Sequence, residues 1–182
     1  MVRDALPERD AQGCLEIYAP FVRDTAVSFE EVVPTLQEFQ ERMRHSMETH
    51  PWLVFDEAGV KGYAYGSQFR GRAAYRWAAD VSVYVAPTAH GRGIGRRLYT
   101  ELLHRLKLQG FYVACATIAL PNEASIGLHR AMGFEPVGVY RNVGWKLGAW
   151  HDVSWWQLEL NAASASRPAE PLPASASRAA PD

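Results

Sequence analysis

The segment with the clearest chemical meaning is a glycine-rich loop, His90-Gly-Arg-Gly-Ile-Gly-Arg96, which lies between a strand-like run and a helix-like run. Glycine lets a backbone approach a ligand closely and adopt conformations that other residues avoid. At a helix N-terminus, such a loop directs several amide N–H groups and the positive end of the helix dipole toward one point. Arg92 and Arg96 add charge at its rim. The segment predicts a phosphate-binding site, and a plain turn before a helix is the alternative.

Two other phosphate-binding loops do not fit the sequence. It contains no G-x-x-x-x-G-K-[ST] motif, which argues against a P-loop nucleoside triphosphatase. The glycines do not form G-x-G-x-x-G, and no acidic residue ends a second strand about 20 positions later, which argues against a dinucleotide-binding fold.

Asp80 is the only acidic residue between Arg70 and Arg97, a span that contains six arginines. A local cluster of arginines suits a small polyanion, although a solvated arginine face is the alternative. An acid in a basic and otherwise apolar strand indicates a polar task for Asp80. Simple pairing with an arginine is the competing interpretation.

Composition narrows the class of protein. The 182 residues suit one domain with a core of its own, and 48% hydrophobic with 21% charged residues is typical of a soluble globular protein. A net charge of -1 argues against a nucleic-acid partner. Two cysteines in apolar stretches indicate free thiols in a reducing compartment, so we expect a cytoplasmic protein. The sequence also shows no signal peptide, no membrane span and no metal-ligand spacing.

The hydrophobic periodicity predicts an alternation of strands and helices. Residues 161–182 are rich in Ala, Ser and Pro, and we expect them to form a disordered tail after a domain at 1–160. Pro20 is expected to kink or split the first helix, and Thr35 with Glu38 forms a capping-box pattern. The order β α α β β β α β α β β predicts an α/β sheet with helices on both faces. The expected strands lie near 2–3, 52–56, 60–67, 78–85, 112–118, 135–143 and 151–160, and the expected helices near 11–22, 35–47, 93–109 and 122–132.

The chain resembles the GNAT (GCN5-related) acetyltransferases through about residues 2–160, because Arg92-Gly-Ile-Gly-Arg96 looks like their pyrophosphate-binding motif. Within that superfamily it is most similar to the phosphinothricin and methionine sulfoximine/sulfone acetyltransferases. The supporting segments are Thr25-Ala-Val-Ser-Phe-Glu30, Val83-Tyr-Val85, Leu120-Pro-Asn122, Leu128-His-Arg-Ala-Met-Gly-Phe134 and Gly144-Trp-Lys-Leu-Gly-Ala-Trp-His-Asp152.

The resemblance implies a mostly antiparallel mixed sheet in which a splayed strand pair holds acetyl-CoA. Backbone groups of three strand residues would bond the pantetheine arm like an added strand. The glycine loop would hold the pyrophosphate, and Asn122 would contact the cofactor arm or simply cap a helix. The implied cofactor-binding residues are Val83, Tyr84, Val85, Gly91, Arg92, Gly93, Ile94, Gly95, Arg96 and Asn122.

The resemblance also implies attack of a primary amine on the thioester. Asp80 matches the position of a glutamate proposed as the base, but it is one methylene shorter, so a water relay is one possibility. His129 stands where many members place a tyrosine near the cofactor sulfur, and it is a candidate acid for the thiolate. A satisfied helix histidine is the alternative, and Tyr84 and Tyr99 are weaker candidates. We expect direct transfer in a ternary complex, because no Ser-His-Asp or Cys-His pairing suggests an acyl-enzyme.

The implied substrate is a small amino-acid-like amine. The residues matching the family's substrate-binding loops are Phe29, Glu30, Arg72, Tyr75 and Arg76. The segment that contains Lys146, Trp150 and His151 is interpreted as pocket wall and dimer contact, because the family tends to dimerise. Trp155 and Trp156 are expected to pack in the sheet.

Two alternatives stay open. One keeps the fold but changes the acceptor to a polyamine, an aminoglycoside or a protein N-terminus, although the arginines argue against a polycation. The other is an acetyl-CoA-binding regulator without catalysis, against which the presence of both Asp80 and His129 counts.

Overall fold

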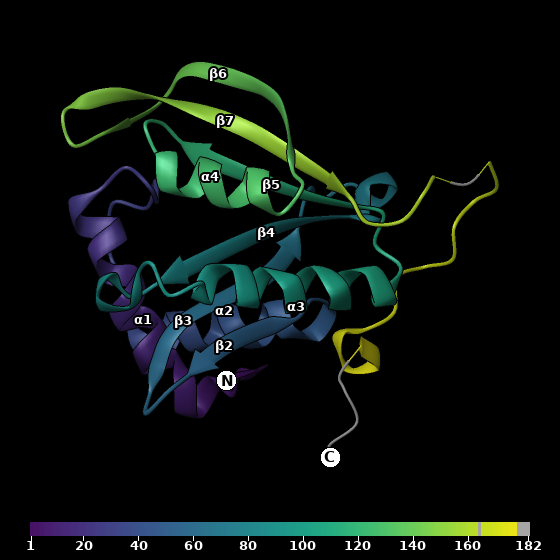
Figure 1. Cartoon of the computed structure of the whole chain (residues 1–182), viewed down its shortest axis with the longest axis horizontal. Helices are drawn as coiled ribbons and strands as arrows, with labels where there is room; N and C mark the ends of the chain where they lie inside the picture. The colour runs from purple at the N-terminus through teal and green to yellow at the C-terminus, as the bar shows by residue number, and fades with distance from the viewer. Residues whose placement is uncertain (164, 178–182) are drawn as a thin grey trace.

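A computed structural model of the chain describes residues 1–163 and 165–177 (Figure 1). Seven strands form one sheet in the order β1-β2-β3-β4-β5-β7-β6, and all neighbours are antiparallel except β4 and β5. The strands are β1 (Val2–Asp4), β2 (Trp52–Asp56), β3 (Val60–Gln68), β4 (Ala78–Val85), β5 (Val113–Ala119), β6 (Glu135–Lys146) and β7 (Ala149–Glu159). The α-helices are α1 (Pro7–Asp24), α2 (Leu36–Thr49), α3 (Ile94–Gln109) and α4 (Glu123–Ala131).

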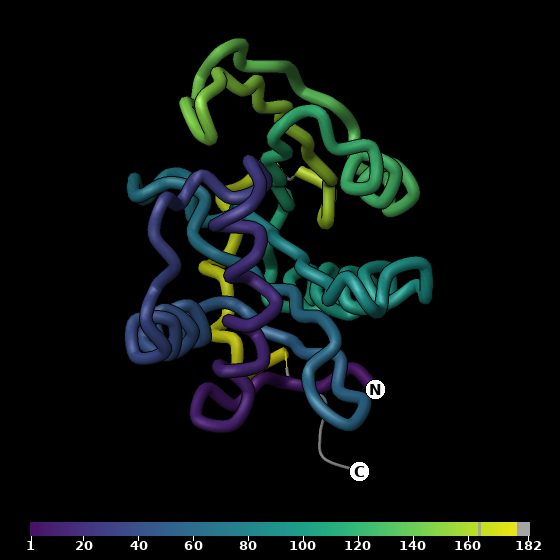
Figure 2. The backbone as a smooth tube through the Cα atoms, turned by 90° about the vertical axis from the view of Figure 1, so that its left-hand side faces the viewer, coloured from purple at the N-terminus to yellow at the C-terminus, as the bar shows by residue number. Residues whose placement is uncertain are grey.

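The helices cover both faces of the sheet, which confirms the expected α/β architecture (Figure 2). On one face, α1 and α2 enclose a core that includes Phe39, Trp52 and Tyr63. On the other face, α3 contributes Leu98 and other buried residues to a second core, against which residues of α4 also pack. No helix of the described residues is long and apolar enough to cross a membrane.

The helix ends follow their sequence signals. The Thr35 hydroxyl accepts a hydrogen bond from the Glu38 N–H group, and the Glu38 carboxylate accepts one from the Thr35 N–H group, as a capping box requires. Gly93 and Gly110 flank α3 with φ angles of 72° and 91°, a left-handed conformation that favours glycine. Asn122 caps α4.

Two local expectations differ from the structure. Helix α1 continues through Pro20 to Asp24 and is not split, because its buried side, which includes Tyr18 and Val22, packs against the sheet on both sides of the proline. The β6–β7 hairpin is longer than expected, since its strands pair to Lys146 and Ala149 around a turn in which Leu147 and Gly148 have positive φ angles.

The described part of the C-terminal segment contacts the folded domain, while the disordered tail that its composition predicts stays a prediction. The N–H group of Leu172 donates to the carbonyl of Gln109, and the Gln109 side-chain amide donates back to the Leu172 carbonyl. Ala174 is buried. A few backbone bonds and small side chains therefore hold a segment of low hydrophobicity against the end of α3. Figure 1 shows the segment beside this helix end. Residues 164 and 178–182 of the expected tail lie outside the described residues.

Strands β4 and β5 pair only over Ala78–Asp80 and Val113–Cys115. Beyond Asp80 the two strands separate, so the β5-facing edge of Val81–Val85 has no strand partner there. The opposite edge of β4 pairs with β3 from Ala79 to Val85. This separation confirms the expected splayed strand pair and leaves backbone donors and acceptors open toward a ligand.

Candidate functional site

A cavity of about 450 Å³ follows the splayed edge of β4 to the N-terminus of α3. It includes every predicted cofactor-binding residue except Arg92. Its lining comprises Val83, Tyr84, Val85, Gly91, Gly93, Ile94, Gly95, Arg96 and Asn122, together with Phe21, Val27, Ala89, His90, Ala124, Ser125 and Leu128. The sequence motif and the strand edge therefore form one continuous surface.

The glycine loop has a shape that other residues would disturb. Gly91 and Gly93 have φ angles of 74° and 72°, which lets consecutive N–H groups turn toward the cavity. A Cβ atom at Gly95 would lie 3.2 Å from the Leu128 side chain, so glycine allows α3 and α4 to approach here. The first turn of α3 carries no acidic residue, which leaves its positive end open to an anion.

Arg92 lies outside this cavity and forms an ion pair with Glu57 at 2.8 Å. Arg96 lines the cavity. The side-chain oxygen of Asn122 accepts a hydrogen bond from the Ser125 N–H group at 3.1 Å. Its amide nitrogen remains available to a ligand, so the capping role and the binding role expected for Asn122 are compatible.

A smaller cavity of about 60 Å³ lies where the two strands separate. Ser82, Thr117 and His129 are among its lining residues. Val27 and Tyr84 line both this cavity and the larger one, so the two spaces adjoin. An elongated ligand could lie with its anionic part at α3 and its other end at the point of separation.

His129 and Tyr99 form a buried pair beside this point. The His129 Nδ1 atom is 2.8 Å from the Ser125 carbonyl oxygen and must donate to it, because a carbonyl only accepts. In the neutral ring, Nε2 then accepts the hydrogen bond from the Tyr99 hydroxyl at 3.1 Å. Burial lowers the pKa of His129, which favours this neutral form. The contacts therefore make His129 an acceptor that orients Tyr99.

Asp80 is the acidic group at the end of the paired part of β4. Its Oδ1 atom is buried and has no hydrogen-bond partner among the described residues. Burial raises the pKa of Asp80 to about 7, while the charge of Arg70 acts in the opposite direction. A carboxyl group whose pKa lies near neutrality can take a proton and release it again, as a general base must.

The loop between α1 and α2 carries Phe29 and Glu30. The Phe29 ring packs over Gly144, where a Cβ atom would overlap it, and lies near His151 of β7. The Glu30 carboxylate accepts a hydrogen bond from Arg42 of α2 at 2.7 Å. Both predicted residues therefore join the loop to neighbouring elements at the edge of the site.

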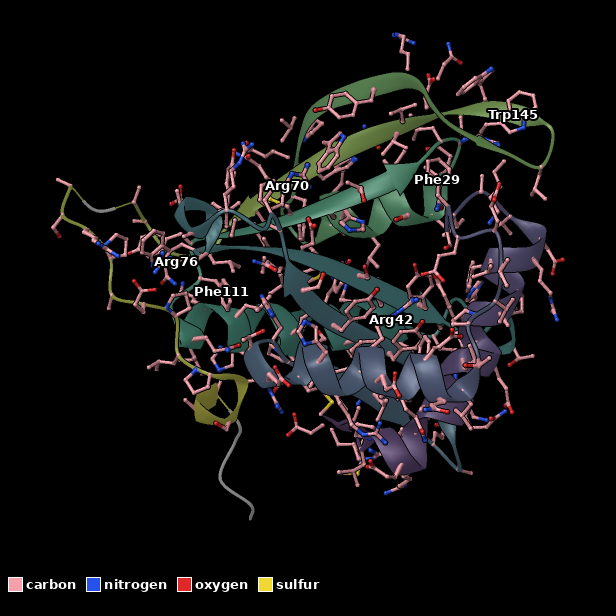
Figure 3. All side chains as sticks on the ribbon, turned by 180° about the vertical axis from the view of Figure 1, so that it is seen from behind. Phe29, Arg42, Arg70, Arg76, Phe111 and Trp145 are labelled. Atoms are coloured by element: carbon pink, nitrogen blue, oxygen red, sulfur yellow. The ribbon has the colours of Figure 1, made fainter. Side chains whose placement is uncertain are left out.

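The structure does not gather the three predicted residues of the loop before β4. Arg76 forms an ion pair with Glu170 of the C-terminal segment at 2.5 Å, which the composition of that segment did not suggest. Tyr75 packs edge-on against Phe69, and Arg72 is exposed. In Figure 3, Arg76 lies beside the C-terminal segment, whereas Arg70 lies beside β5 and β7.

Sequence reasoning missed another polar residue on the face of β4 that carries Asp80. Ser82 follows Asp80 by two positions on β4, so the period of a strand places both side chains on one face. Tyr65 of β3 is the strand partner of Ser82. Strand period could have identified Ser82, but only the register between β3 and β4, which pairs Tyr65 with Ser82, brings these two residues together.

The two cysteines are free thiols. Cys115 pairs with Asp80 across the strands, yet burial raises the pKa of its thiol to about 11. A thiol with so high a pKa is a poor nucleophile near neutral pH. This observation supports the expectation of direct transfer without an acyl-enzyme.

Comparison with known proteins agrees with this geometry. The model of the acetyltransferase (GNAT) domain family matches residues 4–155. Phosphinothricin N-acetyltransferase of Streptomyces viridochromogenes is 35% identical over 164 residues, which cover 90% of each chain. The L-methionine sulfoximine/L-methionine sulfone acetyltransferase of Pseudomonas paraeruginosa is 37% identical over 166 residues, which cover 88% of this chain and 94% of the relative.

A solved structure shows the same fold. The phosphinothricin acetyltransferase of Sinorhizobium meliloti, determined in complex with acetyl-CoA, superposes with a TM-score of 0.85 and 39% identity over 93% of both chains. The cavity along β4 and α3 has the open strand edge and the glycine loop that this co-substrate requires. The chain therefore belongs to the GNAT family of acetyl-CoA-dependent N-acetyltransferases.

Proposed function

We propose that the chain transfers the acetyl group of acetyl-CoA to the primary amine of a small amino-acid-like substrate of the phosphinothricin or methionine sulfoximine/sulfone type. The names of the relatives support this substrate class. The observation that carries the proposal is the buried Asp80 carboxylate with an open acceptor atom, next to the point where β4 and β5 separate.

Asp80 acts as the general base in this proposal. It takes one proton from the substrate ammonium, and the free amine then attacks the thioester directly. The carbon–nitrogen bond forms as the carbon–sulfur bond breaks, and the second amine proton ends on the coenzyme A thiol. The near-neutral pKa of Asp80 suits both the uptake of the proton and its return to solvent.

His129 acts on the site through Tyr99. Its neutral ring accepts from the Tyr99 hydroxyl and holds that side chain at the wall of the small cavity. Direct donation of a proton from His129 to the thiolate would require the imidazolium, which burial disfavours. We therefore assign His129 a positioning role in place of the acid role that the family resemblance implies.

The co-substrate-binding residues keep the roles expected for them. Backbone groups of Val83, Tyr84 and Val85 hold the pantetheine arm, and the amide groups of the loop from Gly91 to Arg96 hold the pyrophosphate. Support comes from the cavity that these residues share. Arg92 lies at the rim, and its pairing with Glu57 outside the cavity must be weakened before its charge can act on a ligand.

The proposal includes a cytoplasmic homodimer. Strand β6 is at the edge of the sheet and pairs only with β7. An edge strand with exposed apolar side chains is typical of a surface that a second copy covers. The exposed apolar residues of this hairpin are Val137, Val139, Tyr140, Val143, Trp145, Leu147 and Trp150. Sedimentation equilibrium should give twice the mass of the chain, and a monomer would contradict this part.

A panel of amines tests the proposed function. Release of free thiol from acetyl-CoA is followed with phosphinothricin, methionine sulfoximine, methionine sulfone, ordinary amino acids and spermidine, for the wild type and Asp80→Ala. We expect turnover with the first three compounds and its loss in the variant. Binding of acetyl-CoA without turnover of any amine, or preference for spermidine, would overturn the proposal.

A further inference from the structure

Strands β4 and β5 meet over a short stretch at one end of the gap between them. Their pairing covers Ala78–Asp80 and Val113–Cys115, which together we call the strand junction. Asp80 is the last residue of the junction on β4, and the open edge of the strand begins directly after it. The junction therefore positions both the proposed base and the start of the acetyl-CoA gap.

The segment after β7 contacts the β4 side of this junction. The Trp77 carbonyl accepts a hydrogen bond from the Tyr112 N–H group at 2.8 Å, so Trp77 extends the junction by one residue. The indole N–H group of Trp77 donates to the Ala169 carbonyl, also at 2.8 Å. The Arg76 guanidinium pairs with Glu170 at 2.5 Å and lies over the Trp77 ring, 5.3 Å from its centroid. Two consecutive residues before β4 are thus bonded to two consecutive residues of the C-terminal segment.

The same segment contacts the residues that lead into β5. The Leu160 N–H group donates to the Tyr112 carbonyl at 2.8 Å. Farther along, the pair of hydrogen bonds between Leu172 and Gln109 joins the segment to the end of α3. In Figure 3, Phe111 of this connection lies beside the C-terminal segment. The segment therefore bridges the two chain stretches whose pairing forms the junction.

The composition of the segment explains how it can be ordered with little apolar area. Pro168, Pro171 and Pro173 flank the residues that bond to the domain. Proline restricts the unfolded chain, so fewer conformations are lost when the segment is fixed. Ala174 and Ser177 are buried near its end, although both side chains are small. Hydrogen bonds, more than apolar burial, therefore hold the segment, and its release is a local event that leaves the core intact.

We infer that residues 160–163 and 165–177 form a strap that fixes the strand junction and thereby positions β4 for acetyl-CoA. Trp77 is a positioning residue in this account, because its side chain bonds to the strap and its backbone bonds to Tyr112. None of the described strap residues lines the acetyl-CoA cavity, so the strap acts through the junction. The inference rests on the co-substrate site of the proposed function and not on the identity of the amine.

The strap and acetyl-CoA should stabilise each other. An ordered strap favours the strand arrangement that binds acetyl-CoA, so linkage requires bound acetyl-CoA to favour the ordered strap by the same factor. The exposed ion pair between Arg76 and Glu170 contributes little by itself. Release of the strap therefore requires that Arg76 and Trp77 be changed together.

The test compares the full-length wild type with the double variant Arg76→Gln/Trp77→Phe. Arg167→Gln is the matched control, because Arg167 pairs with Glu170 at 3.1 Å within the strap and leaves the contacts with the domain intact. Hydrogen–deuterium exchange is followed by mass spectrometry, with and without acetyl-CoA, in peptides that cover 112–115 and 165–177. Exchange in β2, which lies away from the junction, reports any global loss of stability. Calorimetry gives the Kd for acetyl-CoA.

We expect acetyl-CoA to slow exchange severalfold in residues 165–177 of the wild type. The double variant should exchange faster there and at 112–115, and its Kd for acetyl-CoA should rise about fivefold, the loss expected for one hydrogen bond. Arg167→Gln should match the wild type. Arg76→Glu should speed exchange, and the addition of Glu170→Arg should restore it, because the reversed pair remakes the contact.

Three results would overturn the inference. Rapid exchange of residues 165–177 in the wild type, unaffected by acetyl-CoA, would identify them as the disordered tail that composition predicts. An unchanged Kd in the double variant would mean that an ordered strap does not position the junction. Both results would leave the proposed function intact. A wild type that does not bind acetyl-CoA would contradict the co-substrate site of the proposed function and the inference with it.

Discussion

The ammonium group of Lys146, at the tip of the β6–β7 hairpin, lies 2.5 Å from the carbonyl oxygen of Ser28 and donates to it. The same group donates to the carbonyl of Val22 at the end of α1, at 2.6 Å. Lys146 is only 5% exposed. One buried cation therefore ties the hairpin to the loop that carries Val27 and Phe29 at the candidate site.

Lys146→Met should loosen this loop. The substitution leaves two carbonyl groups without their charged donor, so we expect a loss of about 2 kcal/mol in the free energy of unfolding. It should also raise the KM for the amine more than the KM for acetyl-CoA, because the glycine loop is remote from the change. Urea unfolding and steady-state kinetics measure both effects. The exposed Lys107 of α3 offers Lys107→Met as the control, which should match the wild type.

Gly93 and Gly110 allow a matched test of the phosphate-binding loop. Both have positive φ angles at opposite ends of α3, so alanine at either position costs on the order of 1 kcal/mol in stability. Only Gly93 lines the proposed co-substrate cavity. Gly93→Ala should therefore raise the KM for acetyl-CoA severalfold. Gly110→Ala should destabilise the chain without changing this KM. Equal KM values for the two variants would contradict the assignment of this loop.

The raised pKa of Asp80 predicts a pH-dependent cost in stability. The folded state binds the proton up to about pH 7, whereas the unfolded chain releases it near pH 3.8. The free energy of unfolding therefore falls as the pH rises from about 3.8 to about 7, because the proton that stabilises the folded state is lost. Above pH 7, Asp80 causes no further change. Relative to Asp80→Asn, the wild type should lose roughly 2 to 4 kcal/mol from pH 4 to pH 8. A difference that is independent of pH, measured by urea unfolding, would contradict the raised pKa.

Local sequence signals predicted most of the fold. The order of strands and helices, the Thr35–Glu38 capping box and the glycine that ends α3 all follow from residues close to one another in the chain. The splayed strand pair and the residues along it followed from the family resemblance. These features could be anticipated because backbone conformation and one contiguous motif determine them.

Contacts between distant residues could not be predicted in this way. The ion pair between Arg76 and Glu170 depends on how the C-terminal segment crosses the fold, and Arg92 meets Glu57 only through the β2–β3 turn. The position of Arg70 over Trp155 depends on the register of the hairpin. A sequence shows which arginines are available, but tertiary packing decides which of them remains free for a ligand.

The pH dependence of kcat/KM for methionine sulfone, in the wild type and Asp80→Asn, tests the central claim most directly. The wild-type value should rise about tenfold per pH unit up to about pH 7, where burial places the pKa of Asp80, and then level off. Asp80→Asn should lose about 100-fold or more and lack this limb, because no base remains to titrate. A variant that keeps both its activity and the same limb would contradict Asp80 as the base of this acetyltransferase.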